Sequence, residues 1–123
     1  MTAREHIYYG FGQVVYSLAF SDGKIQREER RILEEILHNR LESSASKNIS
    51  AIIFTLLDKD MLLSVQSSFE LGIKNMKLGD NHLTPEMINE FNATLLDVAA
   101  AFPPNTEEEK EIISQFNEAF KNF

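Results

Sequence analysis

Hydrophobic residues recur along the chain with the spacing of amphipathic α-helices. In each of six stretches the apolar residues follow the i, i+3, i+4, i+7 pattern, which places them on one face of a helix. The six series are Phe11, Val14, Val15, Leu18 and Ala19; Ile32, Leu33, Ile36, Leu37 and Leu41; Ile49, Ile52, Ile53, Leu56 and Leu57; Phe69, Ile73 and Met76; Met87, Ile88, Phe91, Leu95, Val98 and Ala99; and Ile112, Ile113, Phe116, Ala119, Phe120 and Phe123. No stretch of useful length alternates as a half-buried strand does. The pattern predicts an all-α fold, compact and multi-helical, with about six helices.

Polar and helix-breaking residues stand between these series. Asp22-Gly23 ends the first helix, ESSASKN separates the second from the third, and LDKDMLLS connects the third to the fourth. Thr84 followed by Pro85 is a strong helix start, because threonine caps free N–H groups and proline is favoured at the first helical position. Thr106 is expected to cap the last helix, whose glutamate-rich first turn suits the positive end of the helix dipole.

Length and composition fit one globular domain spanning residues 1–123, with 43% hydrophobic and 25% charged residues. The formal charge of −7 disfavours nucleic acid and anionic membranes as partners. The absence of cysteine removes disulfides and thiolate chemistry. No uninterrupted apolar run approaches the ~20 residues that span a membrane, and the apolar start lacks the features of a signal peptide. We therefore expect a soluble cytoplasmic protein without membrane insertion.

An internal repeat relates two acidic turns at an offset of 58 residues, as from Asp22 to Asp80. FSDGKIQREE, residues 20–29, aligns with LGDNHLTPEM, residues 78–87, so that Asp, a residue tolerant of positive φ, an aliphatic and Glu recur in order. The flanking apolar positions match as well: Phe11, Val15, Leu18 and Phe20 with Phe69, Ile73, Met76 and Leu78, and Leu33 and Leu37 with Phe91 and Leu95. We interpret the repeat as two related helix–loop–helix units, whose usual pseudo-twofold packing would bring the acidic loops near one another.

The first turn is not an EF-hand. With Gly23 at the glycine position of a calcium loop, Leu18 and Phe20 occupy two ligand positions and offer no side-chain oxygen. In the second copy Met87 replaces the bidentate glutamate. Calcium needs about six to eight oxygen ligands, which neither loop supplies alone.

The stretch YSLAFSDGKIQREERRILEEIL resembles the opening motif of the tellurite-resistance TerB-like domains, and DNHLTPE resembles that family's second acidic loop. VAAAFPPNTEEEKEII is similar to the family's last helix–loop–helix, without its Asp-Gly pair. The resemblance covers nearly the whole chain. It implies an all-helical cytoplasmic protein, linked to stress or metal-oxyanion resistance, without a defined catalytic activity.

The resemblance also implies that the motif acids are candidate ligands of a divalent metal ion. Carried over by position, these acids are Asp22, Glu28, Glu29, Asp80 and Glu86. The chain departs from the family pattern at Ser21, Asn81 and Met87. The structural alternative is that the aspartates close Asx-type turns and the glutamates only oppose helix dipoles.

Three functions remain open at this stage. The first is a non-enzymatic TerB-like interaction or sensing module, with a divalent cation at the paired acidic loops and with a protein partner or a second copy of the chain. The second is a plain protein-interaction domain whose acidic loops are structural and whose acidic surface meets a basic partner. The third is a metal-dependent hydrolase, which would need two metals about 3.5–4 Å apart. His82 could join Asp80 at a metal, and the Phe-rich C-terminus could pack in the core or form a partner groove.

Overall fold

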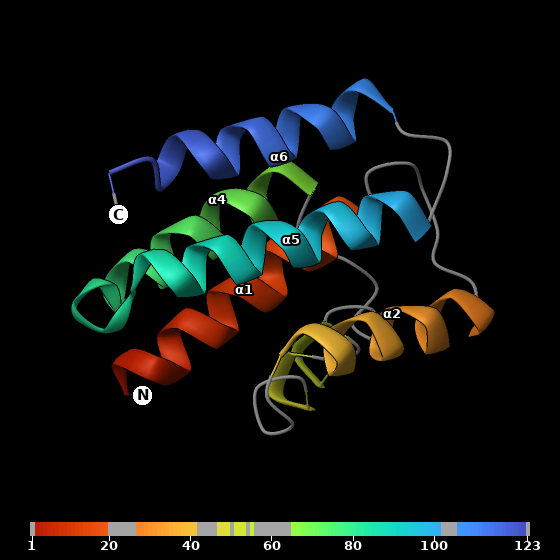
Figure 1. Ribbon diagram of the computed structural model, residues 1–123, viewed down its shortest axis with the longest axis horizontal. Helices are drawn as coiled ribbons and strands as arrows, with labels where there is room; N and C mark the ends of the chain where they lie inside the picture. The colour runs from red at the N-terminus through yellow and green to blue at the C-terminus, as the bar shows by residue number, and fades with distance from the viewer. Residues whose placement is uncertain are drawn as a thin grey trace.

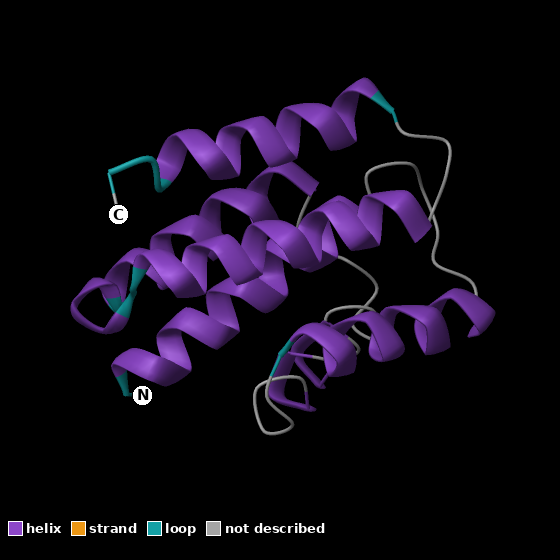
Figure 2. Cartoon of the chain, viewed as in Figure 1, coloured by secondary structure: helices purple, strands orange, loops and turns teal. Residues whose placement is uncertain are grey.

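The computed structural model describes residues 2–19, 27–41, 47–49, 51–53, 55, 65–101 and 106–122, with the backbone alone for 27–30. Over these residues all regular structure is helical (Figure 2). The elements are α1 (Ala3–Ala19), α2 (Arg27–Arg40), α4 (Val65–Leu78), the short 3₁₀ helix η1 (Asp80–His82), α5 (Pro85–Ala101) and α6 (Glu107–Ala119). Residues 47–49, 51–53 and 55 are helical too, where the third series was predicted. The prediction of an all-α, multi-helical fold is confirmed.

Helix α1 is the centre of the fold. It contacts α4, α5, α6 and η1, and its contact with α4 is the most extensive (Figure 1). The sequence pattern predicts a single apolar stripe on this helix, but the structure buries every residue from Gly10 to Ala19. A helix that is enclosed on all sides must also satisfy its polar groups. The Ser17 hydroxyl donates to the Val14 carbonyl oxygen at 2.6 Å, and Gln13 Oε1 accepts from Asn75 Nδ2 at 2.7 Å.

Glycines let α1 and α4 pack backbone against backbone. A Cβ atom added at Gly72 would lie 2.6 Å from the Gly10 carbonyl oxygen, and one added at Gly10 would lie 2.7 Å from the Met76 backbone nitrogen. At the end of α4, a Cβ atom at Gly79 would meet the Ala3 carbonyl oxygen. These contacts pair the start of α1 with the end of α4, so the two helices are antiparallel.

Each helix in the first half of the internal repeat packs against its counterpart in the second half. Helix α1 packs on α4 and α2 packs on α5, in each case antiparallel (Figure 1). Among the matched apolar residues, Ile73 is half-buried, Leu78 is 58% exposed, and Phe20 lies outside the described residues. The others are buried in both halves: Phe11, Val15, Leu18, Leu33 and Leu37 in the first, and Phe69, Met76, Phe91 and Leu95 in the second. Because α1 and α4 are antiparallel, Ala19 at the end of α1 and Leu78 at the end of α4 lie at opposite ends of the bundle. The residues that flank the first acidic loop are therefore far from the second loop, and the first loop itself lies outside the described residues.

The aromatic side chains of α6 belong to the core. Phe116 and Phe120 are 0% and 2% exposed, and their ring centroids lie 5.1 Å apart. Phe11 of α1 joins them to α5, since its ring centroid lies 4.3 Å from that of Phe91, on which it stacks, and 6.3 Å from that of Phe116. The core packing predicted for the Phe-rich end is therefore confirmed for these two residues, and the alternative of an exposed partner groove is wrong for them. Phe123 lies outside the described residues.

Both predicted helix caps are present. Thr84 Oγ1 accepts from the Met87 N–H at 3.1 Å at the start of α5, and Thr106 Oγ1 accepts from the Glu109 N–H at 3.1 Å at the start of α6. The predicted connectors at Asp22-Gly23 and LDKDMLLS lie outside the described residues. None of the helices in the described part of the chain is long and apolar enough to cross a bilayer.

A candidate binding cleft between α1 and α5

The predicted metal ligands occupy separate parts of the chain. Asp22 lies outside the described residues, and Glu28 and Glu29 lie in the first turn of α2, where the backbone alone is described. Asp80 opens η1 and Glu86 lies in the first turn of α5, and both are exposed.

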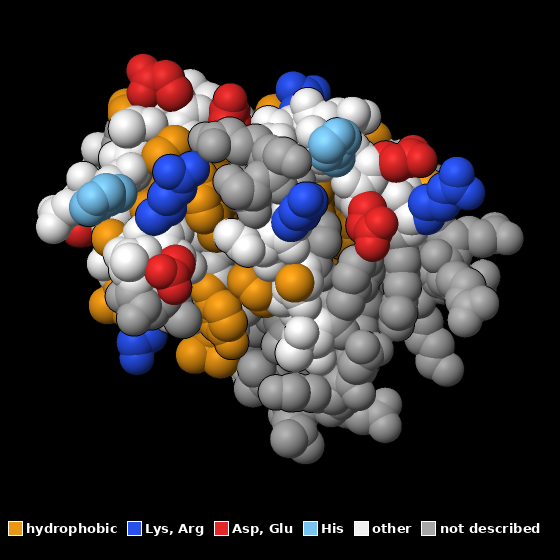
Figure 3. Space-filling view, turned by 90° about the horizontal axis from the view of Figure 1, so that it is seen from below, with side chains coloured by type: hydrophobic (Ala, Val, Ile, Leu, Met, Phe, Trp, Pro, Cys, Tyr) orange, Lys and Arg blue, Asp and Glu red, His pale blue; other side chains and the backbone are white. Residues whose placement is uncertain are grey.

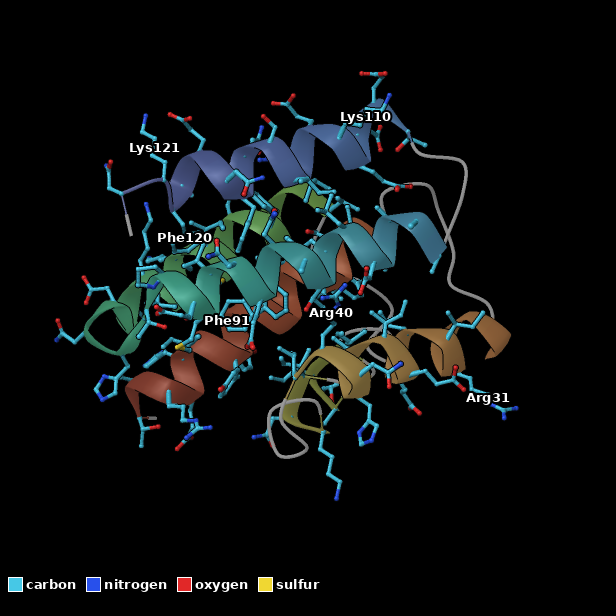
Figure 4. All side chains as sticks on the ribbon, viewed as in Figure 1. Arg31, Arg40, Phe91, Lys110, Phe120 and Lys121 are labelled. Atoms are coloured by element: carbon cyan, nitrogen blue, oxygen red, sulfur yellow. The ribbon has the colours of Figure 1, made fainter. Side chains whose placement is uncertain are left out.

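Glu28 and Glu29, the candidate ligands on α2, lie far from Asp80 and Glu86. Arg40 Nε donates to Asp97 Oδ2 at 2.6 Å, which fixes the C-terminal end of α2 beside the second half of α5 (Figure 4). Because the two helices are antiparallel, the residues that precede Arg40 on α2 and those that precede Asp97 on α5 extend in opposite directions from this ion pair. At about 1.5 Å per residue, Glu28 lies ~18 Å along α2 from Arg40, and Glu86 lies ~17 Å along α5 from Asp97 in the other direction. The structure therefore does not bring Glu28 and Glu29 together with Asp80 and Glu86.

The turn that carries Asp80 is closed by backbone hydrogen bonds. The His82 N–H donates to the Gly79 carbonyl oxygen at 2.9 Å, and the Leu83 N–H donates to the Asp80 carbonyl oxygen at 3.1 Å. Leu83, the aliphatic residue of the repeated motif, is buried as expected. Among the side chains that the structure describes, which do not include those of Asp22, Glu28 and Glu29, no three His, Asp or Glu residues are grouped so that they could hold a metal ion.

His82 instead lines a cleft between the N-terminal half of α1 and the start of α5. The cleft has a volume of about 270 Å³ and includes Leu41, which follows α2. Its apolar lining consists of Ile7, Tyr8, Leu41, Met87 and Phe91. Four of these residues are at most 9% exposed and Met87 is half-buried, so they form a firm floor that belongs to the core.

Aromatic contacts hold the floor of this cleft in place. Tyr8 and Phe91 meet edge to face with ring centroids 6.3 Å apart, an arrangement that the aromatic quadrupole favours. Phe91 also stacks on Phe11, so its ring is held from two sides. The guanidinium carbon of Arg4 lies 5.5 Å from the centroid of the Tyr8 ring, within the range of a cation–π contact. The floor is therefore preformed.

The rim of the cleft is polar. It carries Arg4 from α1, His82 from η1 and Glu90 from α5, and all three side chains are exposed. Figure 3 shows the corresponding side of the molecule, where hydrophobic surface lies among Lys and Arg, His, and Asp and Glu side chains in the left half of the view. An apolar floor with a few convergent polar groups is the usual character of a ligand site.

Sequence reasoning identified His82 but missed Arg4, Tyr8 and Glu90. Arg4 and Tyr8 lie about one helical turn apart on α1, but Glu90 comes more than 70 positions later in the sequence, so no local motif links all three. They become neighbours because α1 packs against α5. The one sequence signal was that Tyr8 extends the predicted stripe, since it precedes Phe11 by three positions and Val15 by seven.

Comparison of the chain with protein-family models, with curated proteins and with solved structures finds no match.

Proposed function

We propose that this protein is a non-enzymatic helical sensing module that binds a small amphipathic ligand in the cleft between α1 and α5. The observation that carries the proposal is the cleft itself, with a buried apolar floor and three exposed polar side chains on its rim. Arginine, histidine and glutamate at such a rim can orient a polar head group, while the floor removes an apolar group from water.

The size of the cleft limits the ligand. Its volume of about 270 Å³ lies just below the ~300–1,000 Å³ that is typical of sites for drug-sized molecules. A ligand with one apolar group of about side-chain size therefore fits better than a larger cofactor. The binding free energy would come mainly from contact with Tyr8, Met87 and Phe91, because aromatic and sulfur-containing side chains offer large contact areas.

A sensing role agrees with the link to stress or metal-oxyanion resistance that the resemblance to TerB-like domains implies, but its residues are those of the cleft and not the motif acids. The implied divalent cation remains a separate prediction. The acids Glu28 and Glu29 lie at the opposite end of the α2–α5 pair from Glu86, which argues against one shared cation site (Figure 1). The hydrolase alternative receives no support from the geometry of the described acids.

A methyl NMR titration tests the proposal. Benzyl alcohol, which has an aromatic ring and one hydroxyl, is added to protein labelled at isoleucine methyl groups. We expect saturable shifts of the Ile7 methyl, because Ile7 lines the floor. The variant Met87→Trp should abolish these shifts by filling the cleft with a larger side chain.

The control for that variant is Ile113→Trp. Ile113 is also a half-buried apolar residue, but it lies on α6 away from the cleft. Circular dichroism establishes that both variants are folded. Equal shifts in wild type and Met87→Trp, or the absence of any saturable shift at Ile7, would show that the cleft is not a binding site.

A further inference from the structure

Side chains of opposite charge line the α1–α5 cleft, one from each of its two helical walls. Arg4 comes from the α1 wall and Glu90 from the α5 wall, and both line the cleft together with the apolar floor. Glu90 directly precedes Phe91 on α5, and the Arg4 guanidinium lies over the Tyr8 ring that Phe91 contacts edge to face. The two charges therefore border the same mouth.

From this arrangement we infer that the ligand is a free α-amino acid with an apolar side chain. The inference rests on the proposed function and specifies the ligand class of the same cleft. The ligand carboxylate pairs with Arg4, the ammonium group pairs with Glu90, and the side chain occupies the floor formed by Ile7, Tyr8, Leu41, Met87 and Phe91.

Each group of such a ligand meets the chemistry that suits it. The guanidinium group has five N–H donors in a planar fork, so Arg4 can bind a carboxylate while it keeps other contacts. A glutamate carboxylate accepts hydrogen bonds from an ammonium group, and charge-assisted bonds of this kind are about twice as strong as neutral ones. The rim of the cleft thus offers a partner of opposite sign to both charges of the amino acid.

Size and shape favour the same class of ligand. An α-amino acid carries both of its charges on one carbon, so both must be paired at one mouth, and Arg4 and Glu90 line that mouth. Its side chain then points away from the charges, toward the floor. A ligand with a single charge would pair with one wall only and would gain one charge-assisted bond instead of two.

The inference is tested with four probes that share one aromatic ring. L-Phenylalanine has both charges, 3-phenylpropionate lacks the ammonium group, phenethylamine lacks the carboxylate, and N-acetyl-L-phenylalanine amide is uncharged, like a residue within a peptide. Dissociation constants come from titrations that follow the Ile7 methyl at low salt. We expect L-phenylalanine to bind about 10-fold more tightly than each singly charged probe, which is the order expected for one charge-assisted hydrogen bond, and about 100-fold more tightly than the uncharged probe, which lacks both bonds.

Charge-neutralising variants identify the residues that recognise the two charges. Arg4→Gln should weaken L-phenylalanine about 10-fold and leave phenethylamine unchanged, because that probe has no carboxylate. Glu90→Gln should weaken L-phenylalanine similarly and leave 3-phenylpropionate unchanged. Arg31→Gln and Glu35→Gln are the matched controls, since these residues form an exposed pair 3.8 Å apart on α2. These two control variants change the net charge in the same way as Arg4→Gln and Glu90→Gln do. They should not alter the affinity for L-phenylalanine or for the singly charged probes.

The outcomes separate the two proposals. If the singly charged or uncharged probes bind as tightly as L-phenylalanine, the inference of an amino-acid ligand is overturned while the binding function of the cleft stands. The same holds if Arg4→Gln and Glu90→Gln act no differently from the α2 controls. If no probe binds, and benzyl alcohol does not bind either, the proposed function fails as well.

Discussion

Gly10 of α1 and Gly72 of α4 face each other so closely that neither position has room for a side chain. A Cβ atom at Gly72 would lie 2.6 Å from the carbonyl oxygen of Gly10 and 2.8 Å from Val14 Cγ2. Real Cβ atoms do not approach a backbone oxygen this closely, so the helices would have to separate. Since α1 also contacts α5 and α6, this contact positions the centre of the fold.

The variant Gly72→Ala should therefore destabilise the protein. Alanine would raise the helix propensity of α4 by about 1 kcal/mol, but forcing a methyl group into a close-packed contact costs ~1–3 kcal/mol or more. We expect a net loss in the free energy of unfolding, measured by urea denaturation. Lys74→Ala, at an exposed position of the same helix, is the control and should change stability little. An increase in stability for Gly72→Ala would contradict the backbone contact.

The hydrogen bond between Asn75 and Gln13 gives a second prediction. Gln13 is 4% exposed, and its Oε1 accepts from Asn75 Nδ2 at 2.7 Å. Asn75→Ala leaves that buried acceptor without this donor, which should cost ~1–3 kcal/mol of unfolding free energy. The double variant Gln13→Leu with Asn75→Leu should recover much of the loss, because it removes both polar groups. A single variant as stable as wild type would show that the bond contributes nothing.

Burial of Tyr16 predicts a loss of stability in alkaline solution. Tyr16 is 1% exposed, and its burial raises the pKa of the phenol above the ordinary value of 10.0. Above pH 10 the unfolded chain therefore binds fewer protons at this residue than the folded chain does. The free energy of unfolding should fall as pH rises from about 10 through the folded pKa, by up to ~1.4 kcal/mol per pH unit.

Melting temperatures between pH 9 and pH 11 test this dependence. Tyr16→Phe removes the phenol and should flatten the fall. Tyr9→Phe removes a phenol from a half-buried position of the same helix and serves as the control. If both variants flatten the curve equally, the burial of Tyr16 is not its cause.

The divalent cation implied by the resemblance to TerB-like domains is tested by calorimetry. Ca²⁺, Mg²⁺, Mn²⁺ and Zn²⁺ are titrated into wild type and into the double variant Asp22→Ala with Asp80→Ala. If the acidic turns bind a cation, wild type shows saturable binding and the double variant loses at least 10-fold in affinity, because each carboxylate supplies charge and oxygen ligands. Binding that the double variant retains in full would exclude these aspartates as ligands.

The local elements of the fold could be predicted from the sequence with good accuracy. The helical spacing of residues such as Leu33, Leu37, Phe91 and Leu95 predicts which faces are buried, and the structure buries all four. The caps at Thr84 and Thr106 were also predictable. In both cases the cause lies within a few residues along the chain, because helical periodicity and capping are local properties.

The burial of α1 and the direction of pairing depended on the tertiary structure. An apolar stripe at Phe11, Val14 and Leu18 predicts one buried face, but it does not show that Gln13 and Ser17 on the other side will be buried as well. From the sequence, Gly10 and Gly72 are expected only to weaken their helices, because glycine has a low helix propensity. In the fold they are what allows the close antiparallel contact of α1 and α4.

By itself, the sequence determined the class of fold and the helices, since both follow from short-range pattern. The placement of the helix ends that flank the repeated acidic motif, with Ala19 and Leu78 at opposite ends of the bundle, was decided only when α1 and α4 packed antiparallel (Figure 1). The cleft was decided in the same way. Arg4, His82 and Glu90 meet at one rim because packing of the apolar helix faces brings α1, η1 and α5 together, and no spacing along the chain encodes that meeting.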